Sequence, residues 1–181
     1  MKLTARDVAL GAIFAALTAI ISQISIPFAS GVPFTLQTFM IQLLAFLLGA
    51  RLGTLTTVLY LLLGAIGLPV FAQMTGGLQI LVGPTGGFLL SFPLMVVIIG
   101  VVLQRTNQFL PLFLAALVAT FINLLIGTGQ FMLVSQVSFS EAMLACFWPF
   151  VFFGVIKAGL AVFFGQRLQR HKAFQSVVLV R

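Results

Sequence analysis

The stretch GLPVFAQMTGGLQILVGPTGGF, residues Gly67–Phe88, divides the sequence between two long apolar segments. It carries six glycines and two prolines but no charged residue. Glycine permits positive φ angles and a close approach of the backbone to its neighbours. We therefore expect a tightly folded segment, which either packs against helices or encloses something small and weakly polar.

The composition around this stretch indicates a membrane protein. Hydrophobic residues make up 61% of the 181 residues, and charged residues make up only 6%. Soluble domains carry roughly 25% charged residues, so this chain has too few charges to cover a soluble core. We expect lipid to surround most side chains and residues 1–181 to form a single transmembrane domain.

Six apolar segments can be drawn along the chain. They are Val8–Ile26, Leu36–Ala50, Gly53–Ile66, Gly86–Leu103, Leu110–Val134 and Glu141–Gln166. A span needs about 20 apolar residues, so we expect the short second and third segments to end within the headgroup zone. The predicted fold is an all-α membrane protein with six transmembrane helices and a glycine-rich outer loop between the third and the fourth.

The basic residues predict the orientation of these spans. With a cytoplasmic N-terminus, the residues on the cytoplasmic side are Lys2, Arg6, Arg51, Arg105 and the tail segment QRLQRHK. The outer loops, which hold no lysine or arginine, are 27–35, 67–85 and 135–140. The positive-inside rule then places both termini in the cytoplasm. The net charge of +7 is read as a topology signal and not as a surface for nucleic acid.

Several classes of function lack the residues that they need. The sequence has no Walker A motif. Its only histidine, His171, lies in the basic tail, so no histidine within a span can serve as the general base of an intramembrane serine hydrolase. There is no cluster of metal-ligating residues, and no acid lies well inside a span, where ion-coupled transport usually places one. An enzyme, including an intramembrane hydrolase, is therefore not expected, and neither is a metal site.

Lys157 is the basic residue embedded in the last apolar segment. It lies ten residues before Arg167, which is roughly 15 Å deeper if the segment is helical. A lysine at bilayer depth costs about 2.5–3.5 kcal/mol on insertion scales. Its ammonium either snorkels to an interface or contacts a ligand that offers an anion or a carbonyl oxygen.

Other polar, glycine and aromatic residues extend this candidate ligand site. Together with Lys157 the candidates are Gln37, Gln73, Thr75, Gly76, Gly77, Gln79, Thr85, Gly86, Asn123 and Trp148. Asn123 either links helices or touches a ligand. Trp148 either anchors the chain at the membrane interface or stacks on a ligand ring.

The first apolar segment carries small residues at a spacing of four. Ala12 with Ala16, and Ala15 with Ala19, form small-xxx-small pairs, which allow another helix to approach closely. These pairs serve either packing within the bundle or docking to a separate membrane subunit.

Four motifs resemble one known family. VPFTLQTF at Val32–Phe39, GLPVFA at Gly67–Ala72, TGGLQILVGPTGGFLLSF at Thr75–Phe92 and PFVFFGVIKA at Pro149–Ala158 look like the BioY family, over most of the chain. This family comprises the biotin-binding S-components of energy-coupling-factor (ECF) vitamin transporters. The resemblance implies a subunit of the prokaryotic plasma membrane that captures biotin from outside. It also implies partners, namely a transmembrane coupling protein, which docks on the small-residue face of the first helix, and two ATPases.

One position departs from the family. Its last helix usually reads PFxxGDxxK, which here places Phe153 at the glycine and Gly154 at the aspartate. The acid that would neighbour Lys157 is therefore missing, so the ligand supplies the negative charge, binds more weakly, or is a different vitamin. The alternatives are uptake of a biotin-like acid such as lipoate or dethiobiotin, and a self-sufficient channel or facilitator.

Overall fold

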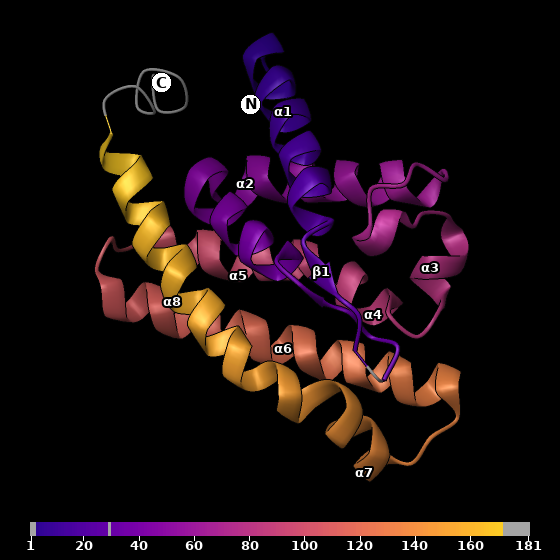
Figure 1. Ribbon diagram of the computed structural model, residues 1–181. Coiled ribbons are helices and arrows are strands. Elements are labelled where there is room, and N and C mark those ends of the chain that lie inside the picture. The colour runs from indigo at the N-terminus through magenta and orange to yellow at the C-terminus, as the bar shows by residue number, and fades with distance from the viewer. Residues whose placement is uncertain (1–2, 29, 172–181) are drawn as a thin grey trace.

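The computed structural model describes residues 3–28 and 30–171, and most of them are helical (Figure 1). The α-helices are α1 (Ala5–Ser22), α2 (Gln37–Ala65), α3 (Leu78–Val82), α4 (Gly86–Leu90), α5 (Phe92–Leu103), α6 (Phe109–Ser135), α7 (Phe139–Ala142) and α8 (Trp148–Arg170). The shorter elements are the strands β1 (Ser25–Ile26) and β2 (Phe34–Thr35), the 3-10 turn Ala72–Met74 and the π-helical turn Met143–Phe147.

Within residues 3–28 and 30–171, five helical stretches are long and apolar enough to cross a membrane, which agrees with a mostly helical fold. They are Ala5–Ser22, Gln37–Ala65, Gly86–Leu103, Phe109–Ser135 and Phe139–Arg170. The second contains both of the short spans drawn from the sequence, because α2 bends at Gly49, where φ is 72°. Its two halves, 37–48 and 50–65, are each shorter than a full span, so six separate crossings stay a prediction.

The last helical region begins at a capping box and is interrupted by a π-helical turn. Ser138 and Glu141 form a capping box, in which the Ser138 hydroxyl accepts from the Glu141 amide and the Glu141 carboxylate accepts from the Ser138 amide. The π-helical turn Met143–Phe147 then interrupts the helix, and α8 restarts with Pro149 in its first turn. Proline fits there because the first helical N–H groups have no partner within the helix.

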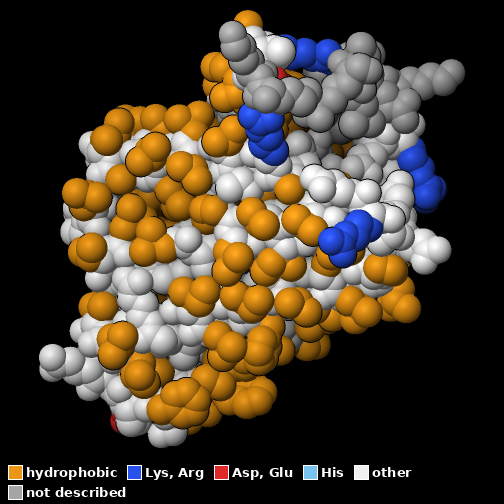
Figure 2. All heavy atoms as spheres, turned by 180° about the vertical axis from the view of Figure 1, so that it is seen from behind, with side chains coloured by type: hydrophobic (Ala, Val, Ile, Leu, Met, Phe, Trp, Pro, Cys, Tyr) orange, Lys and Arg blue, Asp and Glu red, His pale blue; other side chains and the backbone are white. Residues whose placement is uncertain are grey.

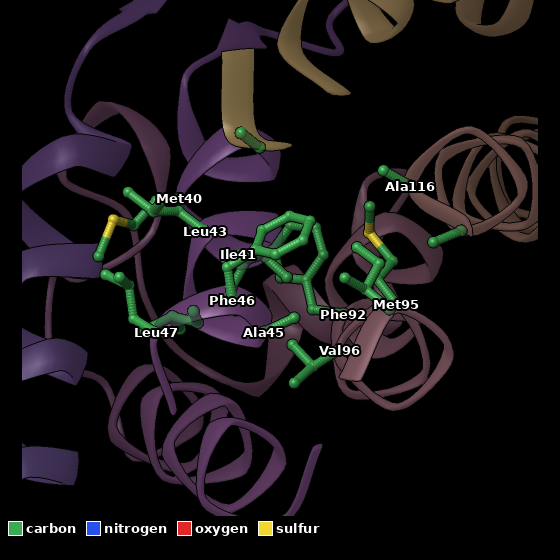
Figure 3. Close-up of a cluster of buried hydrophobic side chains, with 14 of the residues drawn as sticks. Met40, Ile41, Leu43, Ala45, Phe46, Leu47, Phe92, Met95, Val96 and Ala116 are labelled. Atoms are coloured by element: carbon green, nitrogen blue, oxygen red, sulfur yellow. The ribbon is translucent and has the colours of Figure 1, made fainter. Parts of the chain in front are cut away.

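The first half of α2 is the centre of the bundle. Its side chains from Met40 to Leu47 are all buried, as expected of a helix that is surrounded on every face. Figure 3 shows Ile41 and Ala45 of this helix beside Phe92 and Val96 of α5. α1, α5 and α8 all pack on α2, which makes this helix the frame for the site below.

The outer surface is apolar over most of its height. Figure 2 shows hydrophobic side chains over the visible face, with Lys and Arg gathered in its upper half. On α6, the outward stripe Leu114, Val118, Phe121 and Leu125 is 43–52% exposed. Such a face fits lipid, because single apolar side chains are normal on a soluble surface but continuous bands are not.

Four of the five described arginines lie at or near helix ends, and the fifth lies beside the bend within α2. Arg6 lies at the start of α1, Arg51 follows the bend of α2, Arg105 follows α5, and Arg167 and Arg170 end α8. α1 begins and α8 ends on the same side of the molecule (Figure 1). Lys2 and Lys172 lie outside the described residues. The arrangement agrees with the predicted orientation, which stays a prediction.

A short hairpin between α1 and α2 folds back onto α8. β1 pairs with β2 in antiparallel register, with Ser25 opposite Thr35. The Phe34 ring lies 5.8 Å from the Phe150 ring and 4.4 Å from the Phe153 ring, measured between centroids. These contacts fix the hairpin against the part of α8 that carries Lys157.

Candidate functional site

A cavity of about 230 Å³ lies where the hairpin, the start of α2, the segment 71–75, α4, α6 and α8 meet. Aromatic side chains form much of its wall, among them Phe71, Phe88, Phe92 and Phe150. Ligand pockets commonly measure about 300–1,000 Å³ and combine apolar walls with a few polar groups. This cavity therefore suits a small, largely apolar molecule with polar ends.

Lys157 enters this cavity from α8 and is only 9% exposed. Its Nζ donates hydrogen bonds to the Thr35 carbonyl oxygen at 3.2 Å and to Thr38 Oγ1 at 2.7 Å. The same atom lies 4.7 Å from the centroid of the Phe34 ring, within the range of a cation–π contact. The ammonium is therefore held inside the bundle against the start of α2, and it does not snorkel to the surface.

Acidic groups take no part in the hydrogen bonds that hold Lys157. The chain has two acidic residues. Asp7 caps α1 through Thr4, and Glu141 caps α7 through Ser138. Within residues 3–28 and 30–171, no group of three His, Cys, Asp or Glu side chains could hold a metal ion.

Gly154 lines the cavity one helical turn before Lys157. A Cβ atom at this position would lie 2.8 Å from Thr120 Cγ2, so an added side chain displaces that methyl group. Thr120 cannot rotate freely, because its hydroxyl donates to the Ala116 carbonyl at 2.8 Å and accepts from Gln42 Nε2 at 2.9 Å. Gly154 therefore packs closely against Thr120, and a larger residue at this position would require Thr120 to shift.

Asn123 of α6 lines the cavity and also links helices. Its Nδ2 donates to the Phe88 carbonyl oxygen and to Ser91 Oγ, each at 2.7 Å. These bonds use both amide N–H groups and so fix which way the amide points. In the described part of the chain no donor reaches Oδ1, which leaves this oxygen to accept a hydrogen bond from a ligand N–H.

Gln37 and Tyr60 join the start of α2 to the loop that follows its end. Gln37 lines the cavity, is 4% exposed and donates through Nε2 to the Tyr60 hydroxyl. The Tyr60 hydroxyl in turn donates to the Val70 carbonyl at 2.8 Å. This chain of bonds positions the loop beside the cavity, so Gln37 has a structural partner as well as a place in the wall.

Gln23 at the end of α1 clamps the 71–75 segment, and the sequence interpretation missed it. Its Nε2 donates to the Phe71 carbonyl at 3.0 Å, and its Oε1 accepts from the Met74 amide at 2.8 Å. Ser22 donates to the Val70 carbonyl at 2.7 Å beside it. The sequence signal for this clamp is the pair of adjacent polar residues, Ser22 and Gln23, at the end of an otherwise apolar segment.

The glycine-rich segment divides into cavity wall and packing. Its residues that line the cavity include Gln73, Thr75 and Thr85. Those placed outside the lining are Gly76, Gly77, Gln79 and Gly86. A Cβ atom at Gly86 would collide with the Leu81 carbonyl oxygen, and Gln130 Nε2 donates a hydrogen bond to that same oxygen from α6. Glycine is therefore required here for close packing.

Trp148 is placed outside the cavity. It opens α8, is 61% exposed and packs edge-on against Phe147, with ring centroids 5.4 Å apart. This position suits an anchor in the membrane interface, where the amphipathic indole ring is favoured.

The two small-residue pairs of α1 face different surroundings. Ala15 is 1% exposed and belongs to the core, with Ala19 packed against it. Ala12 and Ala16 are exposed. A separate helix can therefore reach the Ala12/Ala16 pair, whereas the Ala15/Ala19 pair already packs within the bundle.

Known proteins are similar to this chain in sequence and in fold. The model of the BioY family matches residues 1–174. The biotin transporter BioY of Thermotoga maritima is 43% identical over 159 residues, which cover 87% of this chain and 92% of that protein. The biotin transporter BioY2 of Lactococcus lactis subsp. cremoris is 42% identical over 160 residues, 88% of this chain and 87% of that protein.

A solved structure has the same fold. The crystal structure of the S-component for biotin from an ECF-type ABC transporter superposes with a TM-score of 0.87 at 23% identity. The match covers 98% of this chain and 100% of that chain.

Proposed function

Because the chain belongs to the BioY family, we propose that it is the biotin-binding membrane subunit of a vitamin uptake system. The observation that carries the proposal is the buried ammonium of Lys157 in the wall of a mostly apolar cavity. Burying a charged side chain is unfavourable unless an opposite charge or hydrogen bonds compensate it. In membrane proteins such a side chain usually marks a substrate or ion site.

The proposed contacts follow from the donors and acceptors that the lining offers. Lys157 meets a ligand oxygen, and Asn123 Oδ1 accepts from an N–H of the urea ring of biotin. Gln37, Thr75 and Thr85 add polar groups, and the apolar rings around the cavity cover the sulfur-containing ring and the aliphatic chain.

We further propose that the cavity opens on the outer side of a prokaryotic plasma membrane, with both termini in the cytoplasm. Ser22 and Gln23 hold the loop beside the cavity, whereas Arg6 lies at the other end of the same helix. On α8, Lys157 lines the cavity and Arg170 lies at the far end. The cavity and the basic residues thus lie toward opposite ends of both helices, as the positive-inside rule requires of an outer site.

Transport requires partners that this chain does not contain. We propose that it works with a transmembrane coupling protein and two ATPase subunits of an ECF module. The support is the fold shared with an S-component and the absence of a Walker A motif from the sequence. The exposed Ala12/Ala16 pair offers the coupling protein a smooth helix face for close approach.

Isothermal titration of the purified chain in lipid nanodiscs tests the proposed ligand. We expect biotin to bind at one site per chain, with lipoate and dethiobiotin competing more weakly. Binding of lipoate or dethiobiotin without binding of biotin would overturn the assignment. Uptake of biotin into liposomes by the chain alone, without ATPases, would contradict the proposed dependence on partners.

A further inference from the structure

The segment 71–75, which forms part of the cavity wall, is packed unevenly against the bundle. Phe71 is 1% exposed, and its ring lies edge-on to the Tyr60 ring with centroids 5.6 Å apart. Gln73 and Met74 are exposed, Met74 to 68%. Apolar packing therefore holds the start of the segment, and its later residues depend on hydrogen bonds.

Two residues of this segment have a left-handed backbone conformation. The φ angle is 58° at Gln73 and 56° at Met74, and neither residue is glycine. In this region Cβ comes too close to a backbone carbonyl oxygen, so such residues are uncommon and persist only where the surrounding structure holds them. The turn at residues 73–74 is therefore strained and requires support.

Gln23 supplies this support from the end of α1. Its Oε1 accepts from the Met74 amide at 2.8 Å, and its Nε2 donates to the Phe71 carbonyl oxygen at 3.0 Å. The two bonds thus bracket the strained turn. Other hydrogen bonds of the segment join its own members, from the Phe71 amide to the Thr75 carbonyl at 3.0 Å and from the Thr75 hydroxyl to the Ala72 carbonyl at 2.8 Å.

We propose that Gln23 is a positioning residue for the ligand, which holds the strained turn at 73–74 and thereby keeps the segment 71–75 in the cavity wall. This inference rests on the proposed function, because its effect is measured on biotin. Gln23 lies outside the cavity lining, whereas Gln73 and Thr75, on either side of Met74, belong to it. Without Gln23, fewer molecules hold the wall in the binding conformation, and the apparent affinity falls by the same fraction.

Removal of the Gln23 side chain gives the first test. Gln23→Ala should lower the affinity of the purified chain for biotin on the order of tenfold, since two hydrogen bonds to the segment are lost. Titration with biotin in lipid nanodiscs measures this change. A Gln23→Ala protein with wild-type affinity would overturn the inference.

Relief of the backbone strain distinguishes positioning from a general loss of stability. Glycine adopts positive φ angles without a steric penalty, so Met74→Gly in the Gln23→Ala protein should restore most of the lost affinity. Met74 lies outside the cavity lining, so its side chain is not a ligand contact. Met74→Ala in the same background removes the side chain without this freedom and should restore nothing. Equal biotin affinities of the two double variants would show that Gln23 does not act through the strained turn.

Amide hydrogen exchange of the ligand-free protein separates this inference from the proposed function. Exchange within residues 71–75 should be faster in Gln23→Ala than in wild type, because the Met74 amide loses its acceptor. Unchanged exchange would contradict the clamp, whatever the affinity for biotin. Faster exchange in Gln23→Ala, together with a wild-type protein that binds no biotin, would instead overturn the proposed function.

Discussion

The cavity and the exposed face of α1 differ in the side chains that they present: the cavity is rich in buried polar groups, and the α1 face has small apolar residues. The cavity gathers buried polar side chains, among them Gln37, Asn123 and Lys157, and holds each with a hydrogen bond. The α1 face presents Ala12 and Ala16, which offer no polar group and almost no relief. The difference teaches that ligand capture and partner docking occupy separate surfaces, so substitutions should affect one without the other.

The largest effect on ligand binding is expected from adding a side chain at Gly86, the glycine that packs most closely beside the cavity. Gly86→Val places a side chain where the Leu81 carbonyl already lies, so we expect loss of biotin binding and of well-folded protein. Size-exclusion chromatography and thermal unfolding of the purified protein measure this. Gly129→Ala on α6, where a Cβ meets nothing within 4 Å, is the matched control and should unfold at the wild-type temperature or higher. A stable, biotin-binding Gly86→Val protein would contradict the close packing.

A bulky residue in the exposed Ala12/Ala16 pair of α1 should prevent partner docking. Ala16→Trp should abolish assembly with the ECF module and cellular biotin uptake, but leave the affinity of the purified chain for biotin within about twofold. Co-purification of the module and titration with biotin separate the two effects.

Ala15→Trp is the matched contrast on the same helix. Ala15 is buried in the core, so the larger ring should destabilise the bundle by about 1–3 kcal/mol or more. If Ala16→Trp lowered biotin affinity as strongly as Ala15→Trp, the separation of the two surfaces would fail.

A smaller effect within the cavity sharpens the role of Asn123. Asn123→Ala removes the acceptor Oδ1 and two interhelical hydrogen bonds, so biotin affinity should fall on the order of 10- to 100-fold. Asn107→Ala, at an exposed asparagine near the opposite end of α6, is the control and should bind as wild type. Titration with biotin reads both variants, and an Asn123→Ala protein of wild-type affinity would remove Asn123 from the site.

The smallest expected effect distinguishes two glutamines of the glycine-rich segment. Gln73 lines the cavity, whereas Gln79 turns back to bond the Gly76 carbonyl at 2.8 Å. Gln73→Ala should weaken biotin binding a few-fold, since an exposed hydrogen bond contributes about 0.5–1.5 kcal/mol. Gln79→Ala should change the affinity less than twofold, and the reverse order would show that the segment closes differently on the ligand.

The sequence predicts the class of fold and the position of Lys157 within the last helix. It does not predict which face of each helix points into the bundle. The apolar runs are local signals, and the structure places its long helices on them. Helices in lipid are apolar on every face, so periodicity does not tell which alanine pair of α1 turns inward.

The same limit applies to the site. Whether a glycine such as Gly86 lines a cavity or permits packing depends on a carbonyl five residues earlier in the chain, which composition does not reveal. The two short predicted spans likewise meet at the single residue Gly49, whose non-helical backbone, with a positive φ, separates the two halves of α2.

Native mass spectrometry of the small molecule carried through purification tests the central claim most directly. We predict one biotin per chain on wild-type protein and little or none on Lys157→Met, with Ala16→Trp retaining the wild-type occupancy. A different bound molecule on wild type, or equal biotin occupancy on wild type and Lys157→Met, would contradict a biotin site built around the buried lysine.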